Sequence, residues 1–145
     1  MAKRHVSIRD LRHELAGETA NVVAWAGCRG DAPDVTHAVL VNQAMPRHPI
    51  ASESVRLQLS TALHRRARSV TMSRVDGTHA NPEQAWKDIG SPEYLKADQV
   101  ELLLAASLVV HEPTAFRADA GVLVIDTVLE PQSVNHLRIE WESAP

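Results

Sequence analysis

The residues best suited to chemistry gather in one short segment, residues 74–92, which reads RVDGTHANPEQAWKDIGSP. Asp76 and His79 could work as an acid and base pair, since a carboxylate beside an imidazole is a common proton-transfer arrangement. Glu83 adds a second carboxylate, and Asn81 could position a substrate. These residues make a small hydrolase one hypothesis for the chain.

The same residues also fit a structural role, which we favour. An aspartate that ends a strand, as Asp76 does before Gly77, commonly accepts hydrogen bonds from the backbone amides that follow. Asn81 precedes a proline and suits the cap of a helix, and His79 could donate to a backbone carbonyl and fasten the loop. Trp86 is predicted to anchor a helix against a core or an interface. A hydrolytic site would also need a pocket and a group that stabilises developing charge, and the sequence offers no motif for either.

A change of hydrophobic period places this segment at the start of a helical insertion over about residues 81–108. Pro82 suits a first helical turn, Gly90 suits a left-handed residue after a short helix, and Pro92 prevents continuation. A second helix is predicted from Ala97 to Ser107, because apolar residues recur on one helical face there.

The rest of the chain alternates apolar and polar residues with a period of two, as half-buried strands do. Runs of this kind cover residues 19–27, 36–43, 54–60, 68–76, 121–129 and 134–141. A turn cluster between the first two runs predicts a hairpin, and the short joint between the third and fourth predicts another antiparallel pair. Residues 3–16 have mixed spacing, and we assign them to a strand.

This order of elements predicts a mainly β protein of the α+β kind, an antiparallel β-sandwich with a two-helix insertion between strands. At 145 residues the chain is expected to form one domain, residues 1–145, with a core of its own. Hydrophobic residues make up 44% and charged residues 23% of the chain, which is ordinary for a globular protein.

Composition excludes several classes of protein. The formal net charge of −3 gives no reason to expect nucleic acid as a partner, and the basic run at residues 64–68 is short and lacks aromatic residues. Cys28 is the only cysteine, so no internal disulfide and no nucleophilic role are predicted. No apolar run is long enough to cross a bilayer and no signal sequence opens the chain, so we expect a cytoplasmic protein without a membrane partner.

Small ligands leave few signals in the sequence. The eight histidines include no pair three or four positions apart, so neither a metal site nor a cofactor is predicted. Carbohydrate is a better candidate, because exposed aromatic rings on a sandwich can stack on sugars. Trp25 and Trp141 are the candidate stacking surfaces, although a core claims most aromatic side chains.

The chemically rich segment resembles one found near the end of family 39 glycoside hydrolases, the β-xylosidases and their α-L-iduronidase relatives. The family pattern is Arg-Ile-Asp, then His-Ser-Asn, then Trp-Lys-x-Met-Gly-Ser-Pro, followed by a helix and Leu-x-x-Pro. The matching residues here are Arg74, Val75, Asp76, His79, Ala80, Asn81, Trp86, Lys87, Ile89, Gly90, Ser91, Pro92, Glu112 and Pro113. Two other segments resemble the family, namely HAVLVNQAMPRHP, with Gln43 where tyrosine is usual, and the closing LEPQSVNHLRI.

The resemblance implies the β-sandwich accessory domain of those enzymes and not their catalytic (β/α)₈ barrel. A barrel of that kind needs about 250 residues, more than this chain has. In the family, two glutamates of the barrel cleave the glycosidic bond, and the Asn-Glu motif of the acid/base residue does not occur in this sequence. No catalytic residue is carried over, and we expect no glycosidase activity from the isolated chain.

Contact with another molecule is the role that the resemblance implies. The family's sandwich packs against its barrel, so a sandwich without the barrel should keep an apolar surface that invites a partner. We expect self-association or binding to a separate barrel-bearing protein. The structural or interface motif would consist of Arg74, Asp76, His79, Asn81, Trp86, Gly90 and Pro92. A module that binds xylan-type carbohydrate and a small glycosidase-like enzyme are the alternatives.

Overall fold

The computed structural model describes residues 4–8, 21–29, 32–60, 66–119 and 121–142 of the chain. Within these ranges the elements are β1 (Arg4–Ile8), β2 (Val22–Arg29), β3 (Ala32–Asn42), β4 (Glu53–Ser60), β5 (Ala67–Val75), α1 (Pro82–Asp88), α2 (Ala97–Ala106), β6 (His111–Pro113), β7 (Arg117–Asp119), β8 (Val122–Leu129) and β9 (Ser133–Trp141). The predicted order, with strands before and after a helical insertion, is confirmed.

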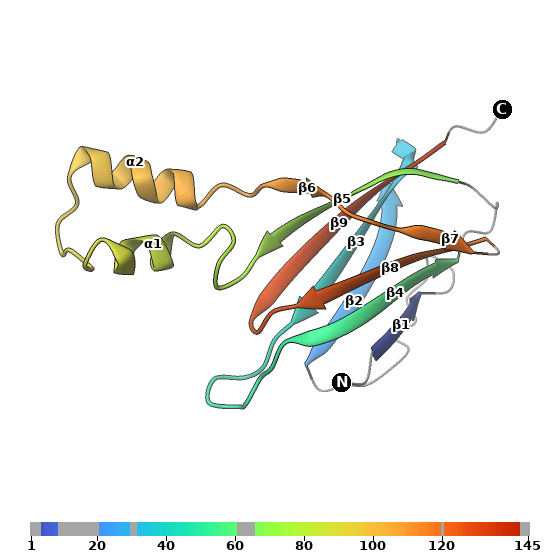
Figure 1. Cartoon of the computed structure of the whole chain (residues 1–145), viewed down its shortest axis with the longest axis horizontal. Coiled ribbons are helices and arrows are strands. Elements are labelled where there is room, and N and C mark those ends of the chain that lie inside the picture. Colours follow the sequence, from blue (N-terminus) through green and yellow to red (C-terminus); the bar gives the residue numbers. More distant parts are fainter. Residues whose placement is uncertain (1–3, 9–20, 30–31, 61–65, 120, 143–145) are drawn as a thin grey trace.

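The strands form two sheets, one in the order β1-β4-β8-β7 and one in the order β2-β3-β9-β5-β6. Figure 1 shows the two sheets as neighbouring layers at one end of the molecule. Among the described strands, every pairing is antiparallel except that of β1 with β4, which is parallel. The predicted mainly β sandwich is therefore present, with one parallel pair added at its edge.

The core lies between the two sheets and is built by the residues that alternate inward. Val55, Leu57 and Leu59 of β4 are buried, and they belong to the same cluster as Leu137 and Ile139 of β9 in the other sheet. Burying one side chain of this size stabilises the folded state by about 1.5 to 3 kcal/mol. One continuous apolar cluster thus holds the two layers together.

The predicted pairing of residues 54–60 with residues 68–76 is wrong. β4 pairs with β1 and β8, whereas β5 pairs with β6 and β9 in the other sheet. Each strand has one apolar face, and alternation does not say whether that face lies beside the neighbouring strand or across the core from it. The strand assigned to residues 3–16 is confirmed for Arg4–Ile8, and the rest of that range lies outside the described residues.

The two helices form an arm that extends away from the sandwich, as Figure 1 shows. We call residues 81–110 the helical arm. α1 and α2 pack against each other, and neither contains a buried residue. The arm therefore presents most of its side chains to its surroundings. In the part of the chain that the structure describes, no helix has the length and apolar character needed to span a membrane.

Candidate functional site

The loop after β5 centres on Asp76, whose side chain is 1% exposed. Its Oδ1 accepts hydrogen bonds from the backbone N–H groups of Thr78 and His79, at 2.8 and 2.9 Å. The Thr78 hydroxyl donates to the same oxygen at 3.1 Å, and His79 Nδ1 lies 2.9 Å from both carboxylate oxygens. One buried carboxylate thus holds the whole loop in place.

Hydrogen bonding favours the ionised form of the Asp76 carboxylate. Burial by itself raises the pKa of Asp76, but the hydrogen bonds from Thr78 and His79 outweigh burial and lower that pKa below its ordinary value. The predicted capping role of Asp76 is confirmed. The predicted partner of the His79 ring is corrected, because Nδ1 donates to this carboxylate and not to a backbone carbonyl.

The remaining motif residues shape the helical arm. Asn81 caps α1, with its Oδ1 accepting from two backbone N–H groups of the first turn at 3.1 and 3.3 Å. Gly90 has a φ of 89°, the left-handed conformation predicted for the residue that ends the first helical segment. The Trp86 indole N–H donates to the carbonyl of Pro92 at 3.0 Å, so Trp86 ties α1 to the segment that leads into α2.

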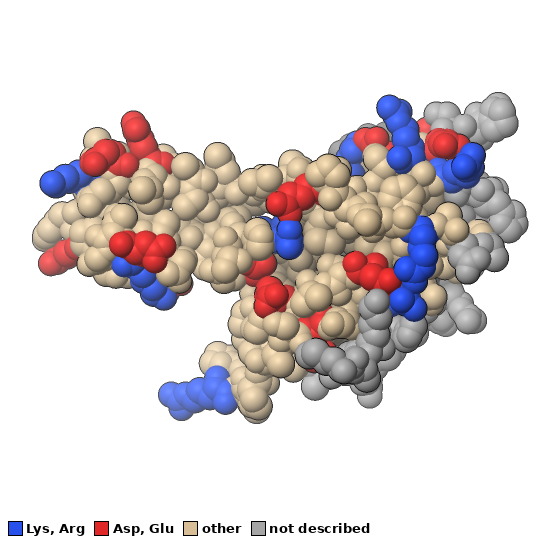
Figure 2. All heavy atoms as spheres, viewed as in Figure 1, with Lys and Arg blue, Asp and Glu red and all other residues tan. Residues whose placement is uncertain are grey.

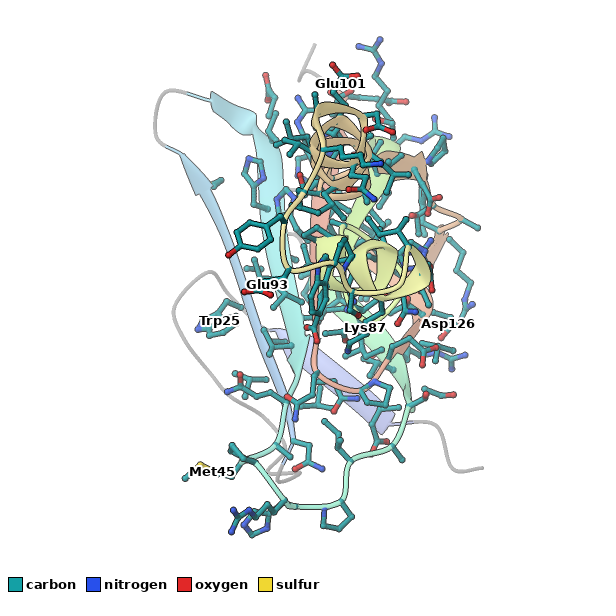
Figure 3. The ribbon with its side chains drawn as sticks, turned by 90° about the vertical axis from the view of Figure 1, so that its left-hand side faces the viewer. Trp25, Met45, Lys87, Glu93, Glu101 and Asp126 are labelled. Carbon is teal, nitrogen blue, oxygen red and sulfur yellow. The ribbon has the colours of Figure 1, made fainter. Side chains whose placement is uncertain are left out.

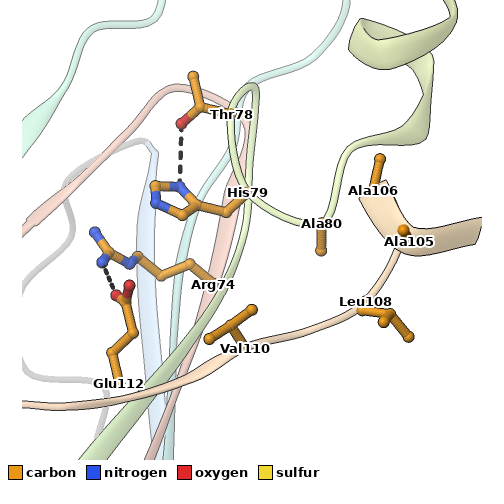
Figure 4. Close-up of a pocket in the computed structure, with 9 residues that line it drawn as sticks. All are labelled: Arg74, Thr78, His79, Ala80, Ala105, Ala106, Leu108, Val110 and Glu112. Carbon is orange, nitrogen blue, oxygen red and sulfur yellow. Dashed lines mark hydrogen bonds and ion pairs between the residues drawn. The ribbon is translucent and has the colours of Figure 1, made fainter. Parts of the chain in front are cut away.

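A pocket of about 250 Å³ opens where the helical arm joins the sandwich (Figure 4). The residues that line it are Arg74, Thr78, His79, Ala80, Ala105, Ala106, Leu108, Val110 and Glu112. Glu112 is the one carboxylate among these described residues, and it forms an ion pair with Arg74. Figure 4 shows the Arg74 side chain between Glu112 and the imidazole of His79.

This pocket does not bring together the groups that a hydrolase needs. Glu83 pairs with Lys87 on the surface of α1 at 2.7 Å and does not line the pocket. The Thr78 hydroxyl approaches the same His79 nitrogen that faces Asp76, at 3.1 Å. A catalytic relay instead places the nucleophile at one ring nitrogen and the orienting carboxylate at the other. The geometry therefore favours the structural interpretation of Asp76 and His79.

A second group of polar and aromatic residues lies on the outer face of the five-stranded sheet. Trp25 of β2 is 50% exposed, and Figure 3 shows Trp25 and Asp126 on opposite sides of the sandwich. His37 of β3 lines the same shallow depression as Trp25. Its Nδ1 lies 2.8 Å from Nε2 of His136 on β9, and the two rings lie edge to edge, with centroids 5.1 Å apart and planes 14° from parallel.

Sequence reasoning missed the pairing of His37 with His136, because the two residues are 99 positions apart. The register of β3 and β9 brings them together. Burial lowers the pKa of His136, and the nearby side chains of His37, His111 and Arg138 lower it further. Across the described residues, no group of three or more histidine, cysteine, aspartate or glutamate side chains is arranged to hold a metal ion.

The prediction that Trp141 offers a sugar-stacking surface is wrong. Its side chain is 7% exposed, and its indole N–H donates to the Thr36 hydroxyl at 2.8 Å in the interior. Trp141 follows Leu137 and Ile139 in the inward-facing alternation of β9, and that alternation directs the ring into the core. Trp25 has the opposite phase on β2 and stays at the surface.

Replacing Asp76 by asparagine should lower the free energy of unfolding by about 1.5 to 3 kcal/mol at pH 7, because the hydrogen bonds to Oδ1 lose their charged acceptor and an NH₂ group replaces the Oδ2 that faces His79. The folded-state pKa of Asp76 is lowered, so its contribution is present above the ordinary value of 3.8 and disappears as the pH falls through the folded-state value. Urea unfolding at pH 7 and at a series of lower pH values should therefore show a gap between parent and variant that narrows as the pH falls.

The control for this measurement is Asp88→Asn on the exposed surface of α1, which should change stability by less than about 0.5 kcal/mol. A gap between parent and Asp76→Asn that keeps its size in acid would contradict the assigned role of the carboxylate.

Comparison with known proteins gives consistent matches. The family described as glycosyl hydrolases family 39 matches residues 15–123. A β-xylosidase of Caldicellulosiruptor saccharolyticus is 31% identical over 97 residues, which are 66% of this chain and 20% of that protein. The solved structure of a bacterial orthologue of human α-L-iduronidase has a TM-score of 0.62 at 15% identity, over 86% of this chain and 22% of that one.

A monomeric β-xylosidase from Caulobacter crescentus CB15 has a similar fold, with a TM-score of 0.56 at 18% identity. The match covers 81% of this chain and 26% of the enzyme. The chain therefore spans only about a fifth to a quarter of the length of the relatives that it matches.

Proposed function

Because the chain belongs to glycosyl hydrolase family 39, we propose that it is a non-catalytic accessory module of that family that works by packing against a folded partner. The resemblance noted in the segment of residues 74–92 is confirmed at the level of the family. The partner would be a catalytic barrel of the same family or, failing that, a second copy of this chain.

The organisation of the described residues supports the non-catalytic part of the proposal. They form two sheets and an arm, and the pocket at their junction offers one carboxylate that is already paired with Arg74. Retaining and inverting glycosidases both need two carboxylic groups that flank the scissile bond. Asp76 does not supply the second group, because its hydrogen bonds are used within its own loop.

The apolar surface of the helical arm is the observation that carries the proposal. Residues 102–110 read LLLAASLVV and contain no charged side chain. The large apolar side chains exposed along this stretch are Leu102 (45%), Leu104 (62%), Leu108 (67%), Val109 (45%) and Val110 (64%). Exposed apolar residues in a contiguous run mark interaction surfaces on soluble proteins, because burying them against a partner removes them from water.

Charge adds a constraint on the partner. The helical arm carries Lys87 and Lys96 against five acidic residues, so its formal net charge is −3. Figure 2 shows the charged side chains at the far end of the arm, with an uncharged surface between that end and the sandwich. A partner surface that is apolar where it meets residues 102–110 and basic at its rim would be complementary.

The proposal is tested by sedimentation velocity of the purified chain, alone and mixed with a family 39 catalytic barrel. A complex with the barrel is expected, and a dimer of the chain would identify the second kind of partner. If the chain is monomeric and does not bind the barrel, the proposal is wrong. Hydrolysis of a nitrophenyl xyloside by the chain, lost in His79→Ala, would show instead that the module is catalytic.

Trp25 supports a second candidate function, the binding of carbohydrate. Its ring is half exposed on the outer face of β2 and lies in a shallow depression shared with His37. An aromatic face with polar groups at its edge suits the apolar face and the hydroxyl groups of a sugar ring.

Titration with xylo-oligosaccharides should then shift the tryptophan fluorescence of the parent and not that of Trp25→Phe at equal sugar concentration. Trp86→Phe, in the helical arm, is the matched control and should respond like the parent. If the fluorescence of the parent does not shift at millimolar sugar, carbohydrate binding at Trp25 is ruled out.

A further inference from the structure

We propose that His37 and His136 form a binding site for a divalent transition-metal ion of the copper or nickel type on the outer face of the five-stranded sheet. Two imidazole nitrogens from neighbouring strands would bind the ion, and water would complete its coordination. The site is separate from the helical arm, so it does not depend on the partner proposed above.

The two ring nitrogens lie close enough to reach one ion once the rings turn. His37 Nδ1 and His136 Nε2 lie 2.8 Å apart. Two imidazole nitrogens that bind one ion at about 2.0 to 2.1 Å and at a right angle to each other lie about 2.9 Å apart. At present the two nitrogens share one hydrogen. When the ion binds, both rings turn their lone pairs toward it, and the hydrogen of the donor ring passes through solvent to the other nitrogen of the same ring, so both ligands are neutral imidazoles.

The sheet holds both ligands in position before the ion arrives. β3 and β9 are paired from Val35 to Asn42, a stretch that includes His37, and neither is an edge strand of the sheet. A site on paired strands loses less conformational entropy on binding than one on loops.

The number and the kind of the ligands distinguish between metal ions. Square-planar and tetragonal sites with nitrogen and oxygen ligands suit Cu²⁺ and Ni²⁺, and Cu²⁺ stands highest in the general order of affinities. Zn²⁺ sites in proteins use three or four protein ligands, and this pair of residues offers two. We therefore expect the order of affinity to be copper, then nickel, then zinc.

The experiment is calorimetric titration of the purified chain with Cu²⁺, Ni²⁺ and Zn²⁺ in a weakly coordinating buffer. Saturable copper binding is expected, and His37→Gln and His136→Gln should each weaken it at least about tenfold. Copper should also quench the fluorescence of Trp25, because that residue and His37 line one depression. His48→Gln, in the exposed loop between β3 and β4, is the matched control and should leave the affinity unchanged.

Thermal unfolding and NMR spectroscopy test the assignment further. Thermal unfolding without metal should be the same for all variants, because glutamine can replace either ring as a hydrogen-bonding group. If one variant has a lower melting temperature than the parent, NMR of the parent locates the site instead. Substoichiometric Cu²⁺ is then expected to broaden the amide signals of β3 and β9 most. Broadening centred elsewhere, or equal affinity in the parent and both glutamine variants, would overturn the assignment.

Discussion

The Asn42→Asp protein should be much less stable than its parent, with a free energy of unfolding lower by about 3 kcal/mol or more. Asn42, the last residue of β3, is completely buried. Its Nδ2 donates to the carbonyl oxygens of Ala51, Leu129 and Glu130, at 2.9, 3.2 and 3.1 Å. One side-chain amide thus joins the end of β3 to the segment before β4, to the end of β8 and to the turn that follows β8.

The substitution keeps the shape of the side chain and reverses its hydrogen bonding. An aspartate at position 42 would place an oxygen where Nδ2 now faces three carbonyl oxygens. If the carboxyl group is ionised, a buried charge has no donor beside it. If it is protonated, its O–H replaces one of the lost donors, but keeping a carboxyl group protonated at neutral pH lowers the free energy of unfolding. Both forms leave buried carbonyl groups without their partner.

Urea unfolding at pH 7 measures the effect, and Asn81→Asp is the control. Asn81 is partly exposed and uses its side-chain oxygen to cap α1, a task that an aspartate oxygen at a helix N-terminus also performs. The control should change stability by less than about 1 kcal/mol. If Asn42→Asp loses no more stability than this control, the Asn42 amide does not hold the two sheets together.

The helical arm shows what local sequence signals can predict. The cap at Asn81, the left-handed Gly90 and the start of the second helix at Ala97 each follow from residues within a few positions of one another. The alternation of apolar and polar residues in β4 and β9 also predicts which side chains face the core, and the structure buries those side chains. Local signals sufficed because caps and strand faces depend on backbone geometry over one turn or one strand.

Long-range partners were not predictable in this way. The alternation of residues 54–60 and 68–76 gave no sign that β4 and β5 belong to different sheets. The meeting of His37 with His136 depends on the register of β3 with β9, and the amide of Asn42 meets carbonyls 87 and 88 positions away. These contacts are set by which strands become neighbours and by the packing of the two sheets, and the spacing of residues along one strand specifies neither.

Replacing both Leu104 and Leu108 by glutamate should abolish binding through the helical arm and leave the chain folded. The two side chains are 62% and 67% exposed, so the free energy of unfolding should change by less than about 0.5 kcal/mol for each substitution. In a docked arm each leucine would lie against the partner, and the loss of a buried anchor costs about 2 kcal/mol. Two such losses weaken the affinity about a thousandfold, as sedimentation velocity would show.

Val128→Glu on β8 is the matched control, since it places the same charge on a side chain that is 50% exposed and outside the helical arm. The Val128→Glu variant should bind the partner with the same affinity as the parent. Glutamate also adds charge to an arm whose net charge is already −3. The variant with lysine at both positions separates the two causes, because burial of leucine predicts the same loss with lysine. Binding that returns with lysine would show that charge, and not apolar contact, governs the association.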